Sequence, residues 1–138
     1  MARIAWIEDD HERIGSLVKL LENDGHTILP YGSWPAVEEQ IETICKCDAI
    51  ILDIILPPVE DDPYLGLSVL EQLRDKHNYR GPVVVCSRVK NPVVIHHLRE
   101  LNVTDILHKP VRPSRLYDVV KKALEGSSKI PYASRHSA

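Results

Sequence analysis

Five short apolar runs alternate with longer amphipathic segments along this chain, and this alternation is the feature that most limits its possible folds. The runs lie within residues 3–7, 26–31, 48–53, 81–87 and 105–109. The central two contain the uninterrupted segments AIIL and VVVC, which have no polar face. Strands of this kind are typical of a parallel sheet that is covered by helices on both sides. We therefore expect an α/β domain with a doubly wound, five-stranded parallel sheet.

Helical spacing follows each apolar run. Gly25 is suited to end the first helix, while Ser33 and Asn91 are good N-caps, each followed closely by a proline. Five helices are predicted, within residues 12–25, 33–45, 67–77, 91–101 and 110–126. Right-handed crossovers through these helices bring the carboxyl ends of the strands to one edge, where such sheets bind their ligands.

Polar residues gather at this predicted edge. Glu8 and Asp9 follow the first strand, Asp53 ends the third, Ser87 ends the fourth and Lys109 ends the fifth. Adjacent carboxylates repel one another unless a cation joins them, and their hard oxygen atoms suit Mg²⁺, with Mn²⁺ as a substitute. An amine and a hydroxyl beside the metal would complete a site for a phosphoryl group. At least one of the carboxylates should have a raised pKa because of like-charge repulsion.

The segments IEDDHERI, DAIILDIILP, VVVCS and ILHKP, in this order, resemble the receiver domain of two-component response regulators. The resemblance covers residues 2–125 and leaves residues 126–138 as a flexible C-terminal tail. It implies a flavodoxin-like fold with strand order 2-1-3-4-5. It also implies that Asp53 accepts a phosphoryl group from a histidine kinase or phosphotransfer protein, and that phosphorylation switches partner binding.

The resemblance assigns a role to each strand-end residue. Ser87 would be the switch hydroxyl and Lys109 the amine that contacts the phosphate. The implied Mg²⁺ ligands are Glu8, Asp9, Asp53 and the backbone carbonyl of Ile55. The resemblance also implies that the chain is not an enzyme that acts on other molecules. It would catalyse only its own Mg²⁺-dependent phosphorylation and dephosphorylation.

The sequence departs from the family pattern at several positions. Ile106 stands where the family often has an aromatic switch residue, so switching through Ser87 would use other packing. Arg88 replaces a commonly small residue and could cover or contact the phosphate. Ile55 and Val89 occupy the positions best placed to orient a hydrolytic water, and neither side chain can form a hydrogen bond. We therefore expect slow loss of the phosphoryl group, tested by substituting polar residues at these two positions.

The expected partner surface comprises the helix 93–101, the strand 105–109 and the helix 110–126. It could support a homodimer or contact an effector protein. Its predicted residues are Val94, His97, Leu101, Ile106, Val111 and Tyr117. A second candidate surface is the loop 57–63, whose acids could shape partner contacts or could simply be solvated. These acids are Glu60, Asp61 and Asp62.

Two other functional classes remain open at this point. The first is a receiver-like interaction module that works without phosphorylation, which the absent aromatic residue favours slightly. The second is an aspartyl-nucleophile phosphohydrolase. Such enzymes typically carry a general acid two residues after the nucleophile, and this position is Ile55, so turnover of external substrates is not expected.

Composition narrows the possible partners and location. The net charge of −3 gives no general attraction to nucleic acid or to an anionic membrane. The N-terminus has no signal-peptide pattern, and no segment has the apolar length of a membrane span. Three cysteines, Cys45, Cys47 and Cys86, fit reduced thiols in a cytoplasmic protein, and the CKC motif lacks the second ligand pair of a zinc site.

Overall fold

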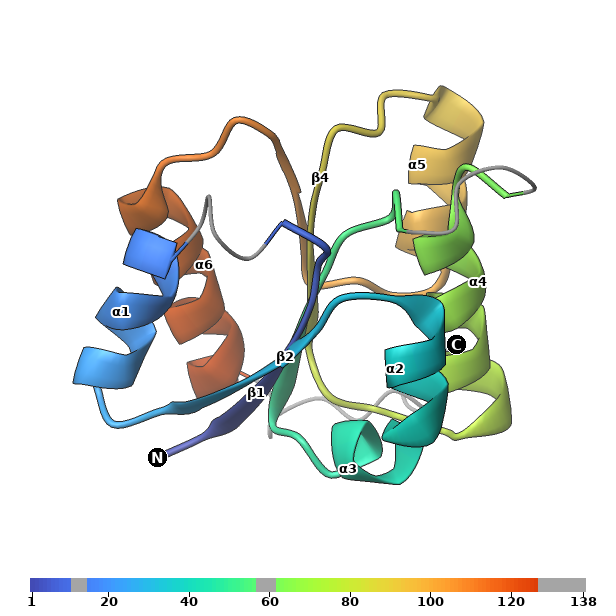
Figure 1. Ribbon diagram of the computed structural model, residues 1–138. Helices are drawn as coiled ribbons and strands as arrows, with labels where there is room; N and C mark the ends of the chain where they lie inside the picture. Colours follow the sequence, from blue (N-terminus) through green and yellow to red (C-terminus); the bar gives the residue numbers. More distant parts are fainter. Residues whose placement is uncertain (11–14, 57–61, 127–138) are drawn as a thin grey trace.

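The computed structural model describes residues 1–10, 15–56 and 62–126 and contains one five-stranded sheet (Figure 1). The strands are β1 (Arg3–Ile7), β2 (Thr27–Tyr31), β3 (Ala49–Leu52), β4 (Val83–Ser87) and β5 (Asp105–His108). They are all parallel and lie in the order β2-β1-β3-β4-β5. The prediction of a doubly wound sheet with the flavodoxin-like order is therefore confirmed.

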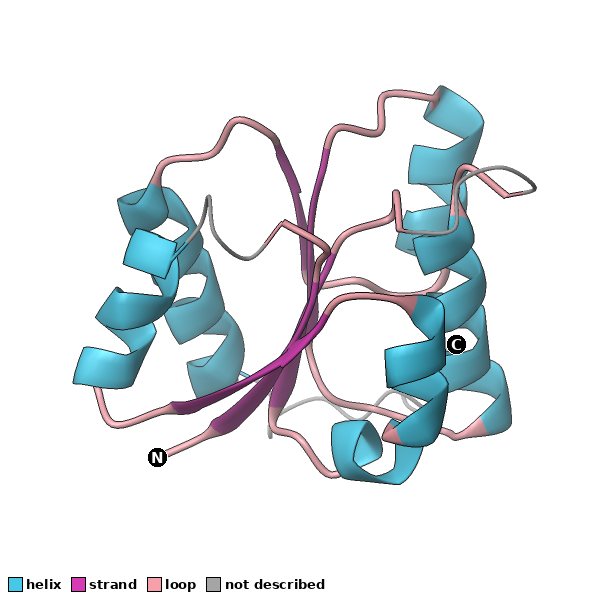
Figure 2. Cartoon of the chain, viewed as in Figure 1, coloured by secondary structure: helices cyan, strands magenta, loops and turns pink. Residues whose placement is uncertain are grey.

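Helices cover both faces of the sheet, as Figure 2 shows. They are α1 (Gly15–Asn23), α2 (Trp34–Glu39), α3 (Ile41–Cys45), α4 (Leu65–Glu71), α5 (Pro92–Glu100) and α6 (Pro113–Gly126), and α4 continues as a π-helical segment, η2 (Gln72–Lys76). Helices α1 and α6 lie on one face, and α2 to α5 lie on the other (Figure 1). Among the described residues, no helix is both long and apolar enough to span a bilayer.

The predicted helix over residues 33–45 is in fact two helices, so the described residues form six α-helices rather than the five expected. The break lies at Gln40, whose backbone angles of −116° and 22° leave the helical region. Gln40 donates its N–H to the carbonyl of Val37 and accepts from the N–H of Ile44. The hydrophobic spacing continues across the break because Val37 and Ile44 are both fully buried, and for this reason the pattern alone indicates one helix.

The predicted helix ends agree with the structure. The Ser33 side chain accepts a hydrogen bond from the N–H of Ala36, and the Asn91 side chain accepts one from Val93. Gly25 follows α1 with a φ of 88°, a left-handed conformation that glycine adopts without steric cost. The predicted start of the first helix lies partly outside the described residues.

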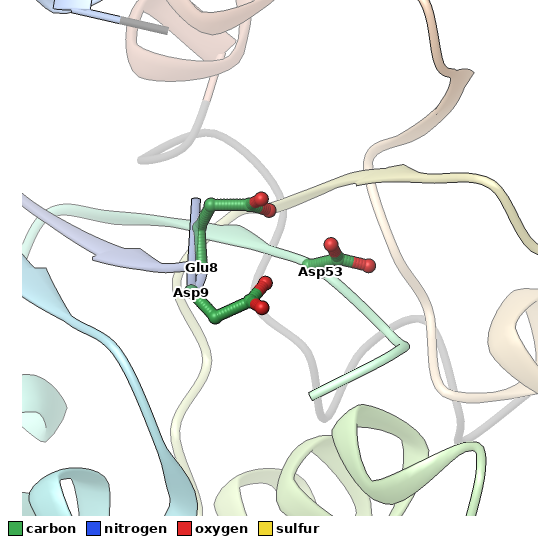
Figure 3. Close-up of side chains that lie close together, drawn as sticks. All are labelled: Glu8, Asp9 and Asp53. Carbon is green, nitrogen blue, oxygen red and sulfur yellow. The ribbon is translucent and has the colours of Figure 1, made fainter. Parts of the chain in front are cut away.

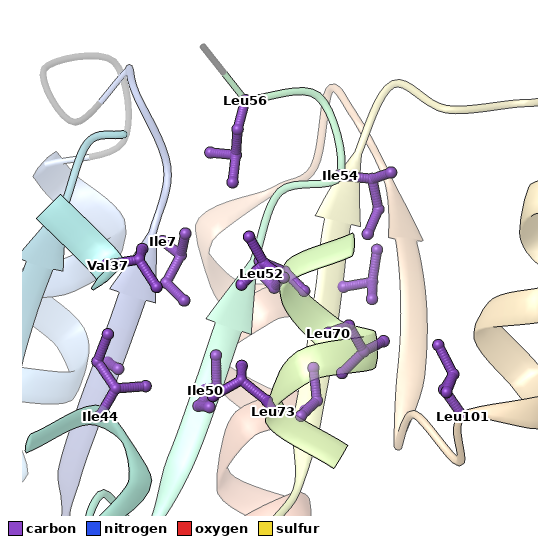
Figure 4. Close-up of a cluster of buried hydrophobic side chains, with 14 of the residues drawn as sticks. Ile7, Val37, Ile44, Ile50, Leu52, Ile54, Leu56, Leu70, Leu73 and Leu101 are labelled. Carbon is purple, nitrogen blue, oxygen red and sulfur yellow. The ribbon is translucent and has the colours of Figure 1, made fainter. Parts of the chain in front are cut away.

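Alternate residues of each central strand pack into two separate hydrophobic clusters. In β1, Ala5 and Ile7 face the cluster under α2 to α5, which Figure 4 shows, while Ile4 and Trp6 face the cluster under α1 and α6. This arrangement buries the central strands on both faces and places their polar groups at the strand ends. The sheet therefore serves as a rigid frame for the residues that follow each strand.

Candidate functional site

Three carboxylates meet at the carboxyl end of the sheet. Glu8 and Asp9 follow β1, and Asp53 follows β3, which is the neighbouring strand (Figure 3). Each residue offers a carboxylate oxygen, and these oxygens lie within 4.8 Å of one another. Glu8 is 2% exposed and Asp53 is 5% exposed, whereas Asp9 is exposed. The site therefore has a buried floor and one ligand that faces solvent.

The Asp53 carboxylate is held by several hydrogen-bond donors. The hydroxyl of Ser87, at the end of β4, donates to Asp53 Oδ1 at 2.7 Å. The backbone N–H of Ile55 donates to the same oxygen at 3.0 Å. Ser87 is 1% exposed, and its oxygen also accepts a weaker bond of 3.4 Å from the N–H of Val89. Asp53 Oδ1 is thus held by a side chain at the end of the neighbouring strand β4 and by the backbone two residues further along the chain.

Lys109 joins the two buried carboxylates. Its ammonium group lies 2.7 and 2.8 Å from the two oxygens of Glu8 and 2.8 Å from Asp53 Oδ2. The residue follows β5, and its backbone N–H donates to the carbonyl of Ser87 at 2.9 Å. Its peptide bond to Pro110 is cis. The structure thus brings together all five strand-end residues that the sequence singles out.

The two buried carboxyl groups differ in their pKa values. Burial, followed by the neighbouring Asp53, raises the pKa of Glu8 to about 7 although Lys109 opposes the shift. Burial also acts to raise the pKa of Asp53, but hydrogen bonds from Glu8, Lys109, Ser87 and the Ile55 N–H outweigh it and hold this pKa below its usual value. One raised pKa was expected, but its largest cause is burial rather than repulsion between like charges.

Gly66, which the sequence analysis did not single out, allows helix α4 to approach the site. A Cβ atom on this residue would lie 2.2 Å from the carbonyl oxygen of Asp53 and 2.5 Å from the Cα of Ile54. The Gly66 N–H donates to the carbonyl of Ile54 at 2.8 Å. Only glycine fits here, so the isolated glycine in YLGL was a detectable signal of close backbone contact.

The acidic loop has one described member, Asp62. Its carboxylate accepts hydrogen bonds from the N–H of Tyr64 and from the hydroxyl of Ser68, and it thereby stabilises the start of α4. Glu60 and Asp61 lie outside the described residues. The predicted partner role of this loop therefore stays a prediction.

The residues predicted to control access to the site lie in different environments. Arg88 is exposed and Ile55 is half-buried, but Val89 is only 2% exposed and packs in the cluster with Val94 and Leu98. The Val89 side chain is therefore part of the core in this structure. Ile55 and Arg88 remain as candidates at the mouth of the site.

The predicted partner surface is less apolar than the sequence suggests. Val94 and Leu101 are 6% and 7% exposed, because both side chains pack in the core. Val93 is the large apolar residue that α5 exposes, at 76%. His97 and Ile106 are half-buried, so this surface is a mixture of polar and apolar groups.

The chemistry of the acidic cluster fits a divalent cation. Carboxylate oxygens are hard ligands, and the exposure of Asp9 leaves room for the water molecules that Mg²⁺ retains. Lys109 carries one positive charge between two buried carboxyl groups, so the cluster can accept further positive charge. The arrangement is thus an acidic pocket with an adjacent amine and hydroxyl.

Comparisons with known proteins agree with this geometry. The family model of the response regulator receiver domain matches residues 4–121. A CheY-like receiver domain from Methanospirillum hungatei has a TM-score of 0.79 at 21% identity, and the alignment covers 94% of this chain and 98% of that one. No curated protein sequence matches the chain.

Two further solved structures share the fold. A two-component response regulator from Clostridium difficile has a TM-score of 0.74 at 25% identity, with 91% of this chain and 97% of that one covered. The beryllofluoride-activated receiver domain of RstA from Klebsiella pneumoniae has a TM-score of 0.70 at 25% identity, with 88% and 97% covered. Because the family model spans most of the sequence, the chain belongs to the response regulator receiver domain family of two-component signalling.

Proposed function

We propose that Asp53 is the phosphoacceptor of a two-component signalling pathway, and that a histidine kinase or phosphotransfer protein supplies the phosphoryl group. The observation that carries this proposal is the arrangement of donors around one buried carboxylate, with Ser87, Lys109 and the Ile55 N–H all directed at Asp53. We further propose that the functional domain is residues 2–125 and that the protein acts in the cytoplasm. The tail predicted over residues 126–138 lies, apart from Gly126, outside the described residues.

The transfer step uses Asp53 as a nucleophile. One carboxylate oxygen attacks the phosphorus of a phosphohistidine, the P–N bond breaks, and the imidazole leaves with its electron pair and takes up a proton. The product is an acyl phosphate on Asp53. The lowered pKa of Asp53 keeps the carboxylate ionised for this attack at neutral pH.

The donors that now hold the carboxylate would stabilise the transferred group. The Lys109 ammonium, the Ser87 hydroxyl and the Ile55 N–H would donate to phosphoryl oxygens, where negative charge develops during transfer. Lys109 also contacts both oxygens of Glu8, so it can release Asp53 Oδ2 and remain paired. This second contact makes Oδ2 the oxygen that is more easily freed for the attack.

Magnesium is the cofactor that suits the acidic pocket, and manganese would substitute for it. Its ligands would be Glu8, Asp9, Asp53 and the backbone carbonyl of Ile55. When bound, the metal neutralises charge on the phosphoryl group. With Glu8 bound to a metal, Lys109 would no longer be needed as the partner of Glu8, and its amine would be available to contact the phosphate.

Output would come from a change of partner binding. Ser87 already donates to Asp53, so its hydroxyl need not travel far after phosphorylation. It also accepts from the N–H of Val89, whose side chain packs against α5, and this route does not require the aromatic residue that Ile106 replaces. Homodimerisation or effector binding through α5, β5 and α6 should therefore strengthen on phosphorylation.

The test is covalent labelling of the full chain with acetyl phosphate and Mg²⁺, followed by intact-mass measurement. We expect one phosphoryl group per chain, no label on Asp53→Asn, and normal labelling of the control Asp118→Asn, which changes an exposed carboxylate on α6. Lys109→Ala should label weakly. Single-site labelling that persists in Asp53→Asn would contradict the assignment.

Absence of labelling in the unmodified protein, from both acetyl phosphate and a phosphotransfer protein, would favour a phosphorylation-independent interaction module instead. Sedimentation with and without beryllofluoride then tests the output. A shift in molecular mass or in partner affinity that requires Asp53 supports the proposed switch.

A further inference from the structure

A cavity lies at the opposite end of the sheet from Asp53. It has a volume of about 320 Å³ and is bounded by the residues that precede β4 and β5 and by one side of α6. Because the strands are parallel, residues at the starts of β4 and β5 lie at the edge farthest from the acidic pocket. Figure 1 shows α6 beside the sheet, on the same face as α1. The cavity is thus separate from the phosphoacceptor site.

One residue that lines this cavity, Arg74, is buried and held by several hydrogen bonds. Arg74 is 3% exposed, and its guanidinium donates to the carbonyls of Tyr79, Gly81, Leu101 and Asn102 at 2.8 to 3.1 Å. These bonds tie the loop before β4 to the loop before β5. A binding site on this wall would therefore need little reorganisation when a ligand enters.

Three exposed cationic side chains line this cavity. Arg80 precedes β4, while Arg115 and Lys122 project from α6, and all three line the cavity and are exposed. Within the described part of the chain, none of these three side chains forms an ion pair with a carboxylate. The chain as a whole carries a net charge of −3, so this concentration of unpaired cations is local. Such a cluster favours an anion.

The remaining polar groups on the wall can accept hydrogen bonds. Asp105 and Asn102 line the cavity beside Thr104, and Asp105 uses one carboxylate oxygen to accept from the N–H of Ile106. A carboxylate in a cationic cavity repels a purely anionic ligand but accepts hydrogen bonds from hydroxyl groups. No aromatic side chain is among the described residues that line the cavity, so stacking of a nucleobase has no partner here.

We infer that this cavity binds a small phosphorylated polyol, such as a sugar phosphate. The phosphoryl groups would contact Arg80, Arg115 and Lys122, and the hydroxyl groups would donate to Asp105. The cavity volume lies at the small end of the range for small-molecule sites, which suits a compact ligand. A bound ligand would link α6 to the loops before β4 and β5.

Calorimetric titration of the full chain with fructose bisphosphate tests the proposal, with EDTA present so that no metal binds at the acidic pocket. We expect saturable binding at submillimolar concentration. The double variant Arg115→Gln/Lys122→Gln should weaken it at least about tenfold, because each charged contact is lost. The control Arg99→Gln/Lys121→Gln, which removes the same charge from exposed positions outside the cavity, should bind normally.

A comparison of fructose bisphosphate with pyrophosphate, which has no sugar hydroxyl groups, separates recognition of the phosphoryl charge from recognition of the hydroxyl groups. Pyrophosphate should bind more weakly than fructose bisphosphate, and Asp105→Asn should reduce this preference. Equal affinity for the two ligands overturns the assignment to polyols. Absence of binding at millimolar concentration, or equal weakening in the control variant, overturns the site itself, and neither result bears on phosphorylation of Asp53.

Discussion

Two cationic side chains at opposite ends of the sheet have different partners: Arg74 is buried and Lys109 is half-buried. Arg74 donates to four backbone carbonyls, which are neutral acceptors with fixed positions. Lys109 instead contacts two carboxylates, Glu8 and Asp53, and both can gain or lose a proton. Both are also proposed metal ligands, and Asp53 is the proposed phosphoacceptor. The first arrangement holds loops together, whereas the second can exchange partners.

This difference explains why the carboxyl end of the sheet, rather than the opposite end, is suited to metal binding and phosphoryl transfer. A guanidinium among carbonyls has a single stable arrangement, since any lost bond leaves a buried acceptor without a donor. The Lys109 cluster contains two carboxyl groups and one amine. Burial, followed by the neighbouring Asp53, raises the pKa of Glu8 to about 7. The Lys109 cluster can therefore accept the positive charge of a metal ion, or a change in the position of the Lys109 amine.

The largest expected effect follows from removal of the structural cation. Arg74→Met should lower the free energy of unfolding by about 3–5 kcal/mol, because several buried carbonyls lose their donors. Urea denaturation followed by tryptophan fluorescence measures this change. Arg80→Met is the matched control, since Arg80 is exposed and its one hydrogen bond, to Asn78, is also exposed.

Arg74→Lys sharpens the same comparison. A lysine keeps the charge but cannot reproduce the planar fork of donors, so it should recover only part of the stability. Full recovery by lysine would mean that charge, rather than hydrogen bonding to the loops, determines the role of Arg74. The proposed contrast between the two ends would then be wrong.

The sequence predicted the acidic end of the molecule well and the opposite end poorly. Glu8, Asp53, Ser87 and Lys109 each end a strand, and parallel strands bring such residues to one edge regardless of the details of packing. Arg74 lies in a predicted helix among other charged residues, and arginine on a helix is usually exposed. Its burial depends on the loop before β4, which is close in sequence, and also on the loop before β5, which begins 27 residues later. The local sequence pattern therefore could not predict it.

Burial of individual side chains shows the same limit. Val94 and Leu101 were expected on a partner surface, and Val89 at the mouth of the site, yet all three pack in the core. The direction in which each of these side chains points depends on how α5 sits on the sheet. The break at Gln40 was equally invisible, since the apolar spacing continues through it.

The next effect concerns the charge balance around Lys109. The folded protein raises the pKa of Glu8 from 4.5 to about 7, so the folded state binds a proton more tightly than the unfolded state does. This group therefore lowers stability as the pH rises from its unfolded pKa through about 7. In metal-free buffer, Glu8→Gln should be more stable than the unmodified protein by about 1–3 kcal/mol at about pH 8 and by much less near pH 4.5.

Thermal or urea denaturation across this pH range, with EDTA present, measures the difference. Glu39→Gln, at an exposed position in α2, is the control and should show no such trend. Adding Mg²⁺ at the higher pH should stabilise the unmodified protein more than Glu8→Gln. A pH-independent gain in Glu8→Gln would show that the buried carboxyl carries no unfavourable charge.

The smallest expected effect concerns the lifetime of the phosphorylated state, and it depends on phosphorylation of Asp53. Ile55 is half-buried beside Asp53 and cannot orient water, so the acyl phosphate should hydrolyse slowly. Ile55→Asn should accelerate the loss of label by about tenfold. This is less than the roughly 10²–10⁴-fold that a positioned general base provides, because an amide orients water without removing its proton. Decay is followed by intact mass after the donor is removed, with Mg²⁺ present.

Ile95→Asn, which makes the same change at a half-buried position on α5, is the control and should leave the decay rate unchanged. Val89→Glu, the other polar substitution suggested by the sequence, is less informative because Val89 is buried and a carboxylate there would destabilise the core. Decay of the unmodified protein within seconds, or an unchanged rate in Ile55→Asn, would show that water reaches the acyl phosphate by a route that Ile55 does not control. Slow decay of the unmodified protein that becomes faster in Ile55→Asn would instead establish that Ile55 prolongs the lifetime of the phosphorylated state.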